Sequence, residues 1–296
     1  MGKATRIRQQ NAREKIAAQR AAERKAEQRR RMFITGGAVL GVIVIVVAFI
    51  LVKSMSSPTT TPTSAARTPL PASVASNITG VPASALATVG KGSVPQYNPA
   101  PITKVTGPAL TSNGKPEMLY IGAEYCPYCA AMRWSMAVAL SRFGALSTPL
   151  HGIHSSSSDV FPNTATLTFY KTGYNSKYLT FTPVENLTVN RSLLQSPTAQ
   201  QNQVWARYEP DASQRGYPFI DIGNRYVIKG PIYDPGVLKG LTWSQIATAM
   251  QNPSSPVAQG VLGAANYMTA AICKTTNNQP ASVCAAPSIK AVAGGL

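Results

Sequence analysis

The residues of this chain most suited to chemistry are two cysteines with two residues between them, in the run Cys126-Pro127-Tyr128-Cys129. In thiol-disulfide exchange, one thiolate attacks a disulfide sulfur and a second thiol displaces the captured partner, so two thiols at this spacing can carry out both steps. The other two of the four cysteines, Cys273 and Cys284, form a second close pair. An even number of cysteines in close pairs is typical of an oxidising compartment.

The residues around the first pair predict a strand, a turn that holds the cysteines, and a helix. Residues 118–122 form a short apolar run, and residues 130–143 place apolar side chains at helical spacing before Gly144. Proline suits the first helical position, so Cys126 falls near the N-cap. There, unpaired backbone N–H groups and the positive end of the helix dipole favour a thiolate. We therefore expect Cys126 to be the nucleophile and the shielded Cys129 to be the resolving thiol.

A zinc site and a purely structural pair are the alternatives for these two cysteines. Zinc needs further ligands, and the candidates are poor because Cys273 and Cys284 have ten residues between them. The two histidines, His151 and His154, fit the ends of a core strand better than a ligand set. We expect no metal, and no cofactor other than the redox-active disulfide itself.

The stretch from Ile121 to Trp134 resembles the thioredoxin-like superfamily, which includes bacterial extracytoplasmic disulfide oxidoreductases and isomerases and the glutaredoxins that carry Cys-Pro-Tyr-Cys. With the segments that precede it, the chain looks most similar to the domain-of-unknown-function family 929, over roughly residues 95–290. This resemblance implies an α/β, thioredoxin-like fold with a central mixed sheet flanked by helices and an inserted segment at about residues 145–210. It implies a class of chemistry rather than a pathway.

A second motif, about 90 residues downstream, fits the same resemblance. Residues 216–228 read as a strand, a Gly-Asn turn and another strand, which predicts a β-hairpin. Pro218 stands where a strand begins, and a trans proline is acceptable there on ordinary grounds. The resemblance instead implies that Pro218 is cis and packs against the reactive disulfide. It also implies that Tyr217, Pro218 and Tyr128 contact the substrate.

The chain departs from the thioredoxin pattern in the strand before the cysteines. Thioredoxins bury an acid in that strand, and the matching position here is Tyr120. The nearest carboxylate is Glu124, two residues before Cys126. Glu124 is either a proton relay to Cys129 or a solvated loop charge, and both interpretations stay open at this point.

Local patterns predict four further elements after the first cysteine pair. Alternation at period two predicts a hairpin over residues 166–182, and residues 197–208 read as a helix. Residues 242–251 have a capping residue and helical character, and residues 257–274 place apolar side chains on one face. We expect this last helix to dock on the sheet.

Cys273 ends the last predicted helix, and Cys284 follows a polar turn. A disulfide between them would close a loop of 12 residues and contribute roughly 3 kcal/mol by the chain-entropy estimate. We interpret the pair as a structural disulfide that fixes the C-terminal tail. The alternative is a second redox pair that relays electrons to Cys126 and Cys129.

The beginning of the chain differs in composition from the rest. Residues 1–31 carry 11 basic and 3 acidic side chains, whereas residues 32–52 carry no charge. As a helix of about 1.5 Å per residue, residues 32–52 span about 30 Å, the hydrocarbon core of a bilayer. Arg29, Arg30 and Arg31 precede them, so the positive-inside bias predicts a single-pass anchor with a cytoplasmic N-terminus and an extracytoplasmic domain. A cleaved signal peptide is the alternative, although its apolar region is usually shorter.

The segments on either side of the predicted membrane helix have different expected roles. The basic residues 1–31 fit a topology signal that touches anionic lipid better than they fit a nucleic-acid partner. Gly37 and Gly41 have the small-xxx-small spacing that would allow a homodimer through the membrane helix. Residues 53–94 are rich in Pro, Ser and Thr, which predicts a disordered linker. Residues 95–296 are left as the folded domain.

The composition of the whole chain is compatible with this plan. The net charge is +17, and 44 % of the residues are hydrophobic, which excludes wholesale disorder. We expect a membrane-tethered thiol-disulfide oxidoreductase that exchanges disulfides with exported proteins, in the oxidase, isomerase or reductase direction. We also expect a membrane redox partner that recycles its cysteine pair. The alternative is a non-catalytic thioredoxin-like module that binds a protein partner or a metal at the cell surface.

Overall fold

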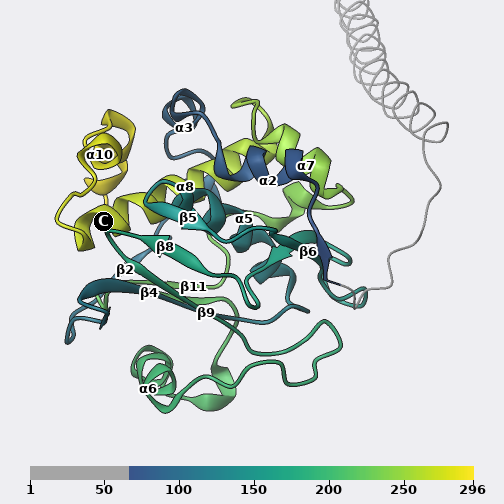
Figure 1. The fold of residues 1–296 in the computed structure, drawn as a ribbon, viewed down its shortest axis with the longest axis horizontal. Helices are drawn as coiled ribbons and strands as arrows, with labels where there is room; N and C mark the ends of the chain where they lie inside the picture. Colours follow the sequence, from purple (N-terminus) through teal and green to yellow (C-terminus); the bar gives the residue numbers. More distant parts are fainter. Residues whose placement is uncertain (1–66) are drawn as a thin grey trace, which may run out of the picture. The chain divides into compact units, whose positions relative to one another are not determined.

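A six-stranded mixed sheet forms the centre of the computed structural model, which describes residues 67–296 (Figure 1). Strand β4 pairs in parallel with β9 on one side and antiparallel with β10 on the other, and β10 continues antiparallel to β11 and then β2. The short β3 pairs with the beginning of β4. The strands are β2 Thr103–Lys104, β3 Thr111–Ser112, β4 Lys115–Gly122, β9 Thr180–Glu185, β10 Phe219–Ile222 and β11 Tyr226–Lys229.

Helices cover both faces of this sheet (Figure 1). One face carries α5 Pro127–Ser141, which packs against α8 Pro256–Thr275, and the other carries α6 Ala199–Tyr208. The alternation of side chains along β4 feeds both cores, since Met118 and Tyr120 pack on the α5 side and Leu119 and Ile121 on the α6 side. The remaining helices are α2 Ala72–Thr79, α3 Ala83–Val89, α4 Val94–Tyr97, α7 Trp243–Ala249, α9 Ala281–Cys284 and α10 Pro287–Ala293, with 3-10 turns at Ala212–Gln214 and Pro235–Leu238.

Two smaller sheets lie outside the central one. β1 Thr68–Pro69, β6 His151–His154 and β7 Ala165–Thr168 form a three-stranded sheet in the order β1-β6-β7. β5 Gly144–Leu146 and β8 Tyr174–Ser176 form an antiparallel pair. His151 and His154 are the first and last residues of β6, as predicted from the sequence.

The predicted hairpin over residues 166–182 is wrong. β7 pairs with β6, while β9 crosses to the central sheet and pairs in parallel with β4. β9 pairs with β4 because this position buries its apolar side chains. Phe181 and Val184 are both buried, one on each side of the sheet. The segment at about residues 145–210 is therefore more than an insertion, since it supplies a strand of the core.

The predicted disordered linker of residues 53–94 is also wrong over the part that the structure describes, residues 67–94. α2 and α3 pack on the domain, and Val74 and Ile78 are 1 % and 0 % exposed. These two side chains lie four residues apart and so share one face of α2, which gives the helix enough apolar surface to bury. The folded domain begins near residue 67 and not at residue 95.

Three predictions from the sequence concern residues that the structure does not describe. The basic head of residues 1–31, the membrane helix of residues 32–52 and the first part of the linker, residues 53–66, lie outside the described range. Within residues 67–296, no helix combines the length and the apolarity that crossing a bilayer requires. The anchor therefore stays a prediction from the sequence.

The other local predictions are confirmed. The helices expected at residues 197–208, 242–251 and 257–274 are α6, α7 and α8, although α8 packs chiefly on α5 and contacts the sheet less, at β10. β10 and β11 form the predicted hairpin, with Gly223 and Asn224 of its turn at φ of 66° and 54°. The expected disulfide joins Cys273 to Cys284 with a Cα–Cα distance of 5.5 Å and ties the end of α8 to α9.

Candidate redox-active cysteine site

Cys126 lies at the N-terminal end of α5, directly after the loop that leaves β4. Its φ and ψ of −75° and 121° are those of an N-cap residue, and Pro127 occupies the first helical position, as predicted. The Cys126 Sγ accepts a hydrogen bond from the backbone N–H of Cys129 at 3.3 Å. The nucleophile proposed from the sequence is thus held where a helix end stabilises negative charge.

The two thiols of the pair have opposite electrostatic environments. The Cys129 thiol hydrogen-bonds to Cys126 and, with the Cys129 N–H and the charge of Arg133, lowers the pKa of Cys126 against the opposing effect of burial. Burial raises the pKa of Cys129 well above its ordinary value, and the neighbouring Cys126 adds to this effect. Cys126 is 4 % exposed and Cys129 is fully buried. The arrangement suits Cys126 for attack and Cys129 for the later, internal step.

The Tyr217–Pro218 peptide bond is cis, as the family resemblance implied. The Cys126 thiol donates to the backbone oxygen of Tyr217 at 3.7 Å, so this bond lies directly beside the reactive sulfur. The Tyr217 ring stands edge-to-face with Tyr125 at 6.3 Å and lies 5.6 Å from Trp205. Contact of Tyr217, Pro218 and Tyr128 with a substrate remains a prediction.

The environment of Glu124 contradicts one of its two expected roles. It is 2 % exposed, so the interpretation as a solvated loop charge is wrong. Its carboxylate accepts two hydrogen bonds from Arg67, both of 2.8 Å, and a third of 2.8 Å from the Thr168 hydroxyl. These contacts anchor the loop before Cys126. A role of Glu124 as a proton relay to Cys129 remains a prediction. None of the described contacts of its carboxylate supports that role.

A buried ion pair behind the cysteines was missed in the sequence. Arg133 and Glu185 are both 0 % exposed, and the Arg133 Nε and Nη2 donate to the two Glu185 oxygens at 2.8 and 2.6 Å. Nη2 also donates to the Ala123 carbonyl at 2.8 Å. The available signal was one arginine four residues after Cys129, on the same face of an otherwise uncharged helix. Its partner came from β9, whose place in the sheet was not foreseen.

Two loops flank the Cys126 end of α5. The Ser156 N–H donates to the Tyr125 carbonyl, and the Glu124 N–H donates to the Leu187 carbonyl, so both loops are fastened to the turn that precedes Cys126. Val160 and Leu193 on these loops are 61 % and 67 % exposed and are two of the three large apolar side chains exposed within residues 67–296. The two loops are joined by Arg191 and Asp159 at 3.3 Å. Exposed apolar side chains thus lie on both loops beside the cysteine site.

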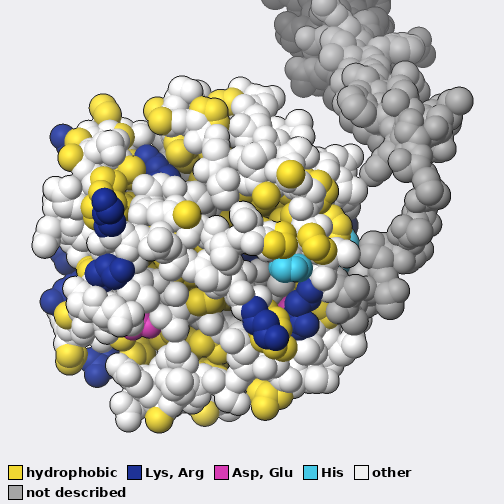
Figure 2. Space-filling view, viewed as in Figure 1, with side chains coloured by type: hydrophobic (Ala, Val, Ile, Leu, Met, Phe, Trp, Pro, Cys, Tyr) yellow, Lys and Arg dark blue, Asp and Glu magenta, His cyan; other side chains and the backbone are white. Residues whose placement is uncertain are grey.

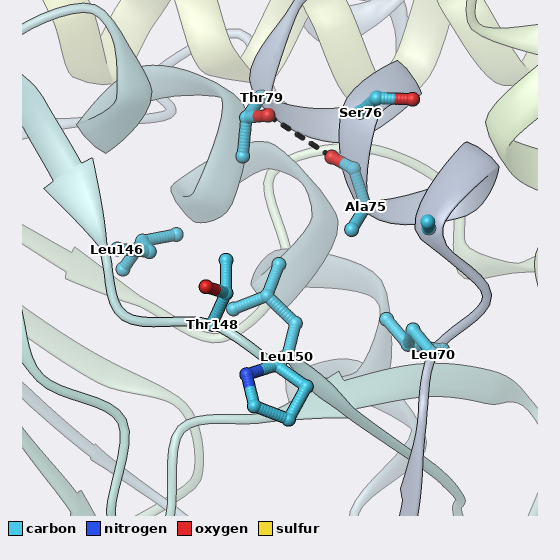
Figure 3. A pocket seen from close by; sticks show the side chains of 9 residues that line it. Leu70, Ala75, Ser76, Thr79, Leu146, Thr148 and Leu150 are labelled. Carbon is cyan, nitrogen blue, oxygen red and sulfur yellow. Dashed lines mark hydrogen bonds between the residues drawn. The ribbon is translucent and has the colours of Figure 1, made fainter.

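An apolar groove of the described domain lies elsewhere (Figure 3). It has a volume of about 550 Å³ between α2 and the segment that joins β5 to β6, and its lining is mostly apolar, with Leu70, Leu146 and Leu150 among the side chains. Thr79 beside it donates to the Ala75 carbonyl at 3.0 Å. None of its lining residues belongs to the cysteine pair or the two flanking loops.

Charged groups that could hold a metal are sparse in the described domain. Among residues 67–296, no three His, Cys, Asp or Glu side chains lie close enough together to bind a metal ion. His154 instead lies with its ring 4.6 Å from Trp243. On the face of the domain in Figure 2, Lys and Arg side chains are prominent and acidic ones are scarce.

Comparison with known proteins gives one match. The family model described as "Domain of unknown function (DUF929)" matches residues 101–274, which is more than half of the chain and includes both cysteines of the candidate site. No curated protein and no solved structure matches the chain.

Proposed function

This chain belongs to the DUF929 family, whose description names no activity, and we propose that it is a membrane-tethered thiol-disulfide oxidoreductase. The observation that carries this proposal is the placement of Cys126. Its sulfur caps a helix and accepts the N–H of Cys129 at 3.3 Å, and it lies 3.7 Å from the backbone oxygen of Tyr217, the residue before the cis Pro218. A structural pair of thiols does not require a place at a helix N-terminus, whereas a nucleophilic thiolate requires stabilisation by donors such as the Cys129 N–H.

The order of the central strands supports a thioredoxin-like fold. β9, β4, β10 and β11 are neighbours in that order, with one parallel pairing followed by two antiparallel ones. The cysteine helix follows the central strand β4, and the cis proline opens β10, the strand beside it. This is the arrangement that a thioredoxin-like core uses to bring its cysteine pair and its cis proline together.

The reaction follows from the asymmetry of the pair. In the reducing direction, the Cys126 thiolate attacks a substrate disulfide and forms a mixed disulfide, and one substrate sulfur leaves as a thiolate. Cys129 then loses its proton and attacks Cys126 Sγ, which closes the Cys126–Cys129 disulfide and releases the second substrate sulfur. In the oxidising direction the same bonds form and break in reverse order. The direction depends on the reduction potential, which ranges from about −270 mV in thioredoxin to about −120 mV in the strongest oxidant.

The proposed substrates are exported proteins with thiols or disulfides. Exposed Val160 and Leu193 on the loops beside Cys126 suit a polypeptide better than a small polar thiol, since they offer apolar contact on the protein surface. The location outside the membrane, the anchor and a homodimer through the anchor are proposals from the sequence of the N-terminal part. A membrane redox partner that recycles the pair is a proposal of the same kind, because each round of exchange leaves Cys126 and Cys129 in the opposite redox state and a further thiol or disulfide must restore them.

Two variants of the full-length chain test this proposal. Cys126→Ser is expected to abolish insulin reduction and oxidative refolding activity, whereas Cys273→Ala with Cys284→Ala serves as a control that removes thiols from another site. Cys129→Ser is expected to accumulate mixed disulfides, whose other halves identify substrates and the recycling partner. If Cys126→Ser retains wild-type turnover, the enzymatic proposal is wrong, and a module that binds a protein or a metal without catalysis replaces it.

A further inference from the structure

The most unusual polar cluster of the domain lies behind the resolving cysteine. Cys129, Tyr120 and Arg133 are all 0 % exposed, and they come from α5 and the central strand β4. Within residues 67–296 only three buried side-chain polar atoms lack a hydrogen-bond partner, and two of them belong to this cluster, Tyr120 Oη and Arg133 Nη1. A buried donor without a partner costs about 1–3 kcal/mol, so two in one place call for an explanation.

The Tyr120 hydroxyl has room at this place because residue 122 is a glycine. A Cβ atom on Gly122 would lie 2.0 Å from Tyr120 Oη, so the hydroxyl lies against a glycine that leaves it room. The Arg133 guanidinium lies with its Cζ 6.0 Å from the centre of the Tyr120 ring. Its other two nitrogens are occupied by Glu185 and the Ala123 carbonyl, which fixes the orientation of the guanidinium and leaves Nη1 free.

Cys126 and Arg133 of α5 both act on the Cys129 thiol, and Cys129 in turn acts on the Tyr120 hydroxyl of β4. Glu185 of β9 faces the same cluster through its ion pair with Arg133. A negative charge on Cys129 also raises the pKa of Tyr125 and of Tyr217. Burial keeps the pKa of Tyr120 well above 10, so its hydroxyl keeps its proton and can donate. Arg133 is the cation of the cluster, and its charge lowers the pKa of Cys129 against the effect of burial.

We propose that Tyr120 Oη and Arg133 Nη1 form a binding site for the thiolate of Cys129, which stabilises that anion in the resolving step. The inference rests on the proposed function and deepens it. In the mixed disulfide, Cys129 gives up its proton and its sulfur turns to Cys126. The new Cys129–Cys126 bond forms as the bond from Cys126 to the substrate sulfur breaks, and the departing substrate thiolate takes up the proton that Cys129 lost. The two unpartnered donors gain an acceptor only while Cys129 is an anion.

The cluster also explains how a fully buried thiol can act as a nucleophile. Burial alone would leave Cys129 almost entirely protonated at neutral pH, and the resolving step would then be slow. A charge-assisted hydrogen bond from Tyr120 and the charge of Arg133 offset this effect only in the state that reacts. Tyr120 occupies the position at which thioredoxins bury an acid, so the chain places a hydrogen-bond donor there in place of a carboxylate.

The test is the reaction of the reduced full-length chain with 5,5′-dithiobis(2-nitrobenzoate) in a stopped-flow instrument. The first release of coloured thiolate reports the attack by Cys126, and the second reports the resolving attack by Cys129. Tyr120→Phe is expected to leave the first release unchanged and to slow the second roughly tenfold to a hundredfold. The second release should also require a pH about one to two units higher to reach the wild-type rate.

Tyr233→Phe is the matched control. Tyr233 is likewise fully buried, and its hydroxyl donates at 2.8 Å to the carbonyl of Ala131 in α5, the helix that carries Cys129. Loss of this hydroxyl should change neither release. Arg133→Lys keeps a cation but withdraws Nη1, and it should slow the second release as Tyr120→Phe does. A second release that keeps its wild-type rate and pH profile in Tyr120→Phe overturns the inference.

Failure of this inference and failure of the proposed function have different signatures. If the wild-type chain gives no first release, Cys126 is not nucleophilic and the proposed function fails. The thiolate site can then still be tested in Cys126→Ser, by measuring the rate at which methyl methanethiolsulfonate modifies Cys129. This modification involves no resolving step. Adding Tyr120→Phe to that variant should slow the modification of Cys129 at least tenfold, and an unchanged rate contradicts the thiolate site.

Discussion

The substitution Arg67→Ala tests whether the segment before α2 is part of the active-site structure. Arg67 is the first residue that the structure describes, and both its Nε and its Nη2 donate to the Glu124 carboxylate at 2.8 Å. Glu124 is 2 % exposed and lies two residues before Cys126. Removing Arg67 leaves a buried carboxylate whose remaining side-chain partner is the Thr168 hydroxyl.

The size of the effect follows from the burial of the two partners. Breaking a fully buried ion pair costs about 3–5 kcal/mol, because the remaining charge is left desolvated. Arg67 is 29 % exposed, so water replaces part of the lost interaction, and we expect a loss of about 2–3 kcal/mol in the free energy of unfolding. For a domain of this size that loss lowers Tm by roughly 5–10 °C.

The assay is thermal and urea unfolding of the full-length chain, followed by circular dichroism. Arg191→Ala is the matched control, because Arg191 also pairs with an acid beside the site but is 54 % exposed, and its loss should cost at most about 1 kcal/mol. The double variant Arg67→Ala/Glu124→Gln should be more stable than Arg67→Ala alone, since the unpaired charge is gone. Equal losses for Arg67→Ala and Arg191→Ala would refute the reasoning.

Three further predictions concern other parts of the domain. Burial raises the pKa of Asp221 to about 6, so the native state binds the extra proton and stability falls as pH rises through about 6. Asp221→Asn should therefore raise the free energy of unfolding by up to about 3 kcal/mol at pH 8 and by much less near pH 4, and equal gains at both pH values would contradict this. Replacing Cys273 and Cys284 by alanine should cost about 3 kcal/mol in urea unfolding but leave the alkylation rate of Cys126 unchanged. Leu193→Asp should raise KM for reduced or oxidised polypeptides several-fold while glutathione disulfide turnover stays constant, and a parallel change in both would argue against a polypeptide surface.

Local signals in the sequence were sufficient for the elements that carry the cysteines. Pro127 after Cys126 predicts the helix start, and the Gly223-Asn224 turn predicts the hairpin, because each depends on the conformational preference of a few adjacent residues. The disulfide of Cys273 and Cys284 is likewise a short-range feature. These parts of the fold and of the site could be predicted from the sequence.

The partners that complete the site come from distant parts of the chain and could not be predicted in this way. Glu185 reaches Arg133 only because β9 pairs in parallel with β4, and a parallel pairing leaves no turn signal between its strands. Arg67 reaches Glu124 across 57 positions from a segment whose Pro-, Ser- and Thr-rich surroundings resemble a linker. The one local clue there was Val74 and Ile78 at helical spacing.

The pH dependence of Cys126 alkylation tests the central claim most directly. The reduced full-length chain is treated with iodoacetamide over a range of pH values, and modification of Cys126 is followed by mass spectrometry of its peptide. Because the Cys129 thiol, the Cys129 N–H and the charge of Arg133 lower the pKa of Cys126, the rate should reach half its maximum at a pH clearly below the value of about 8.5 for an ordinary thiol. A midpoint at or above about 8.5 would contradict the account.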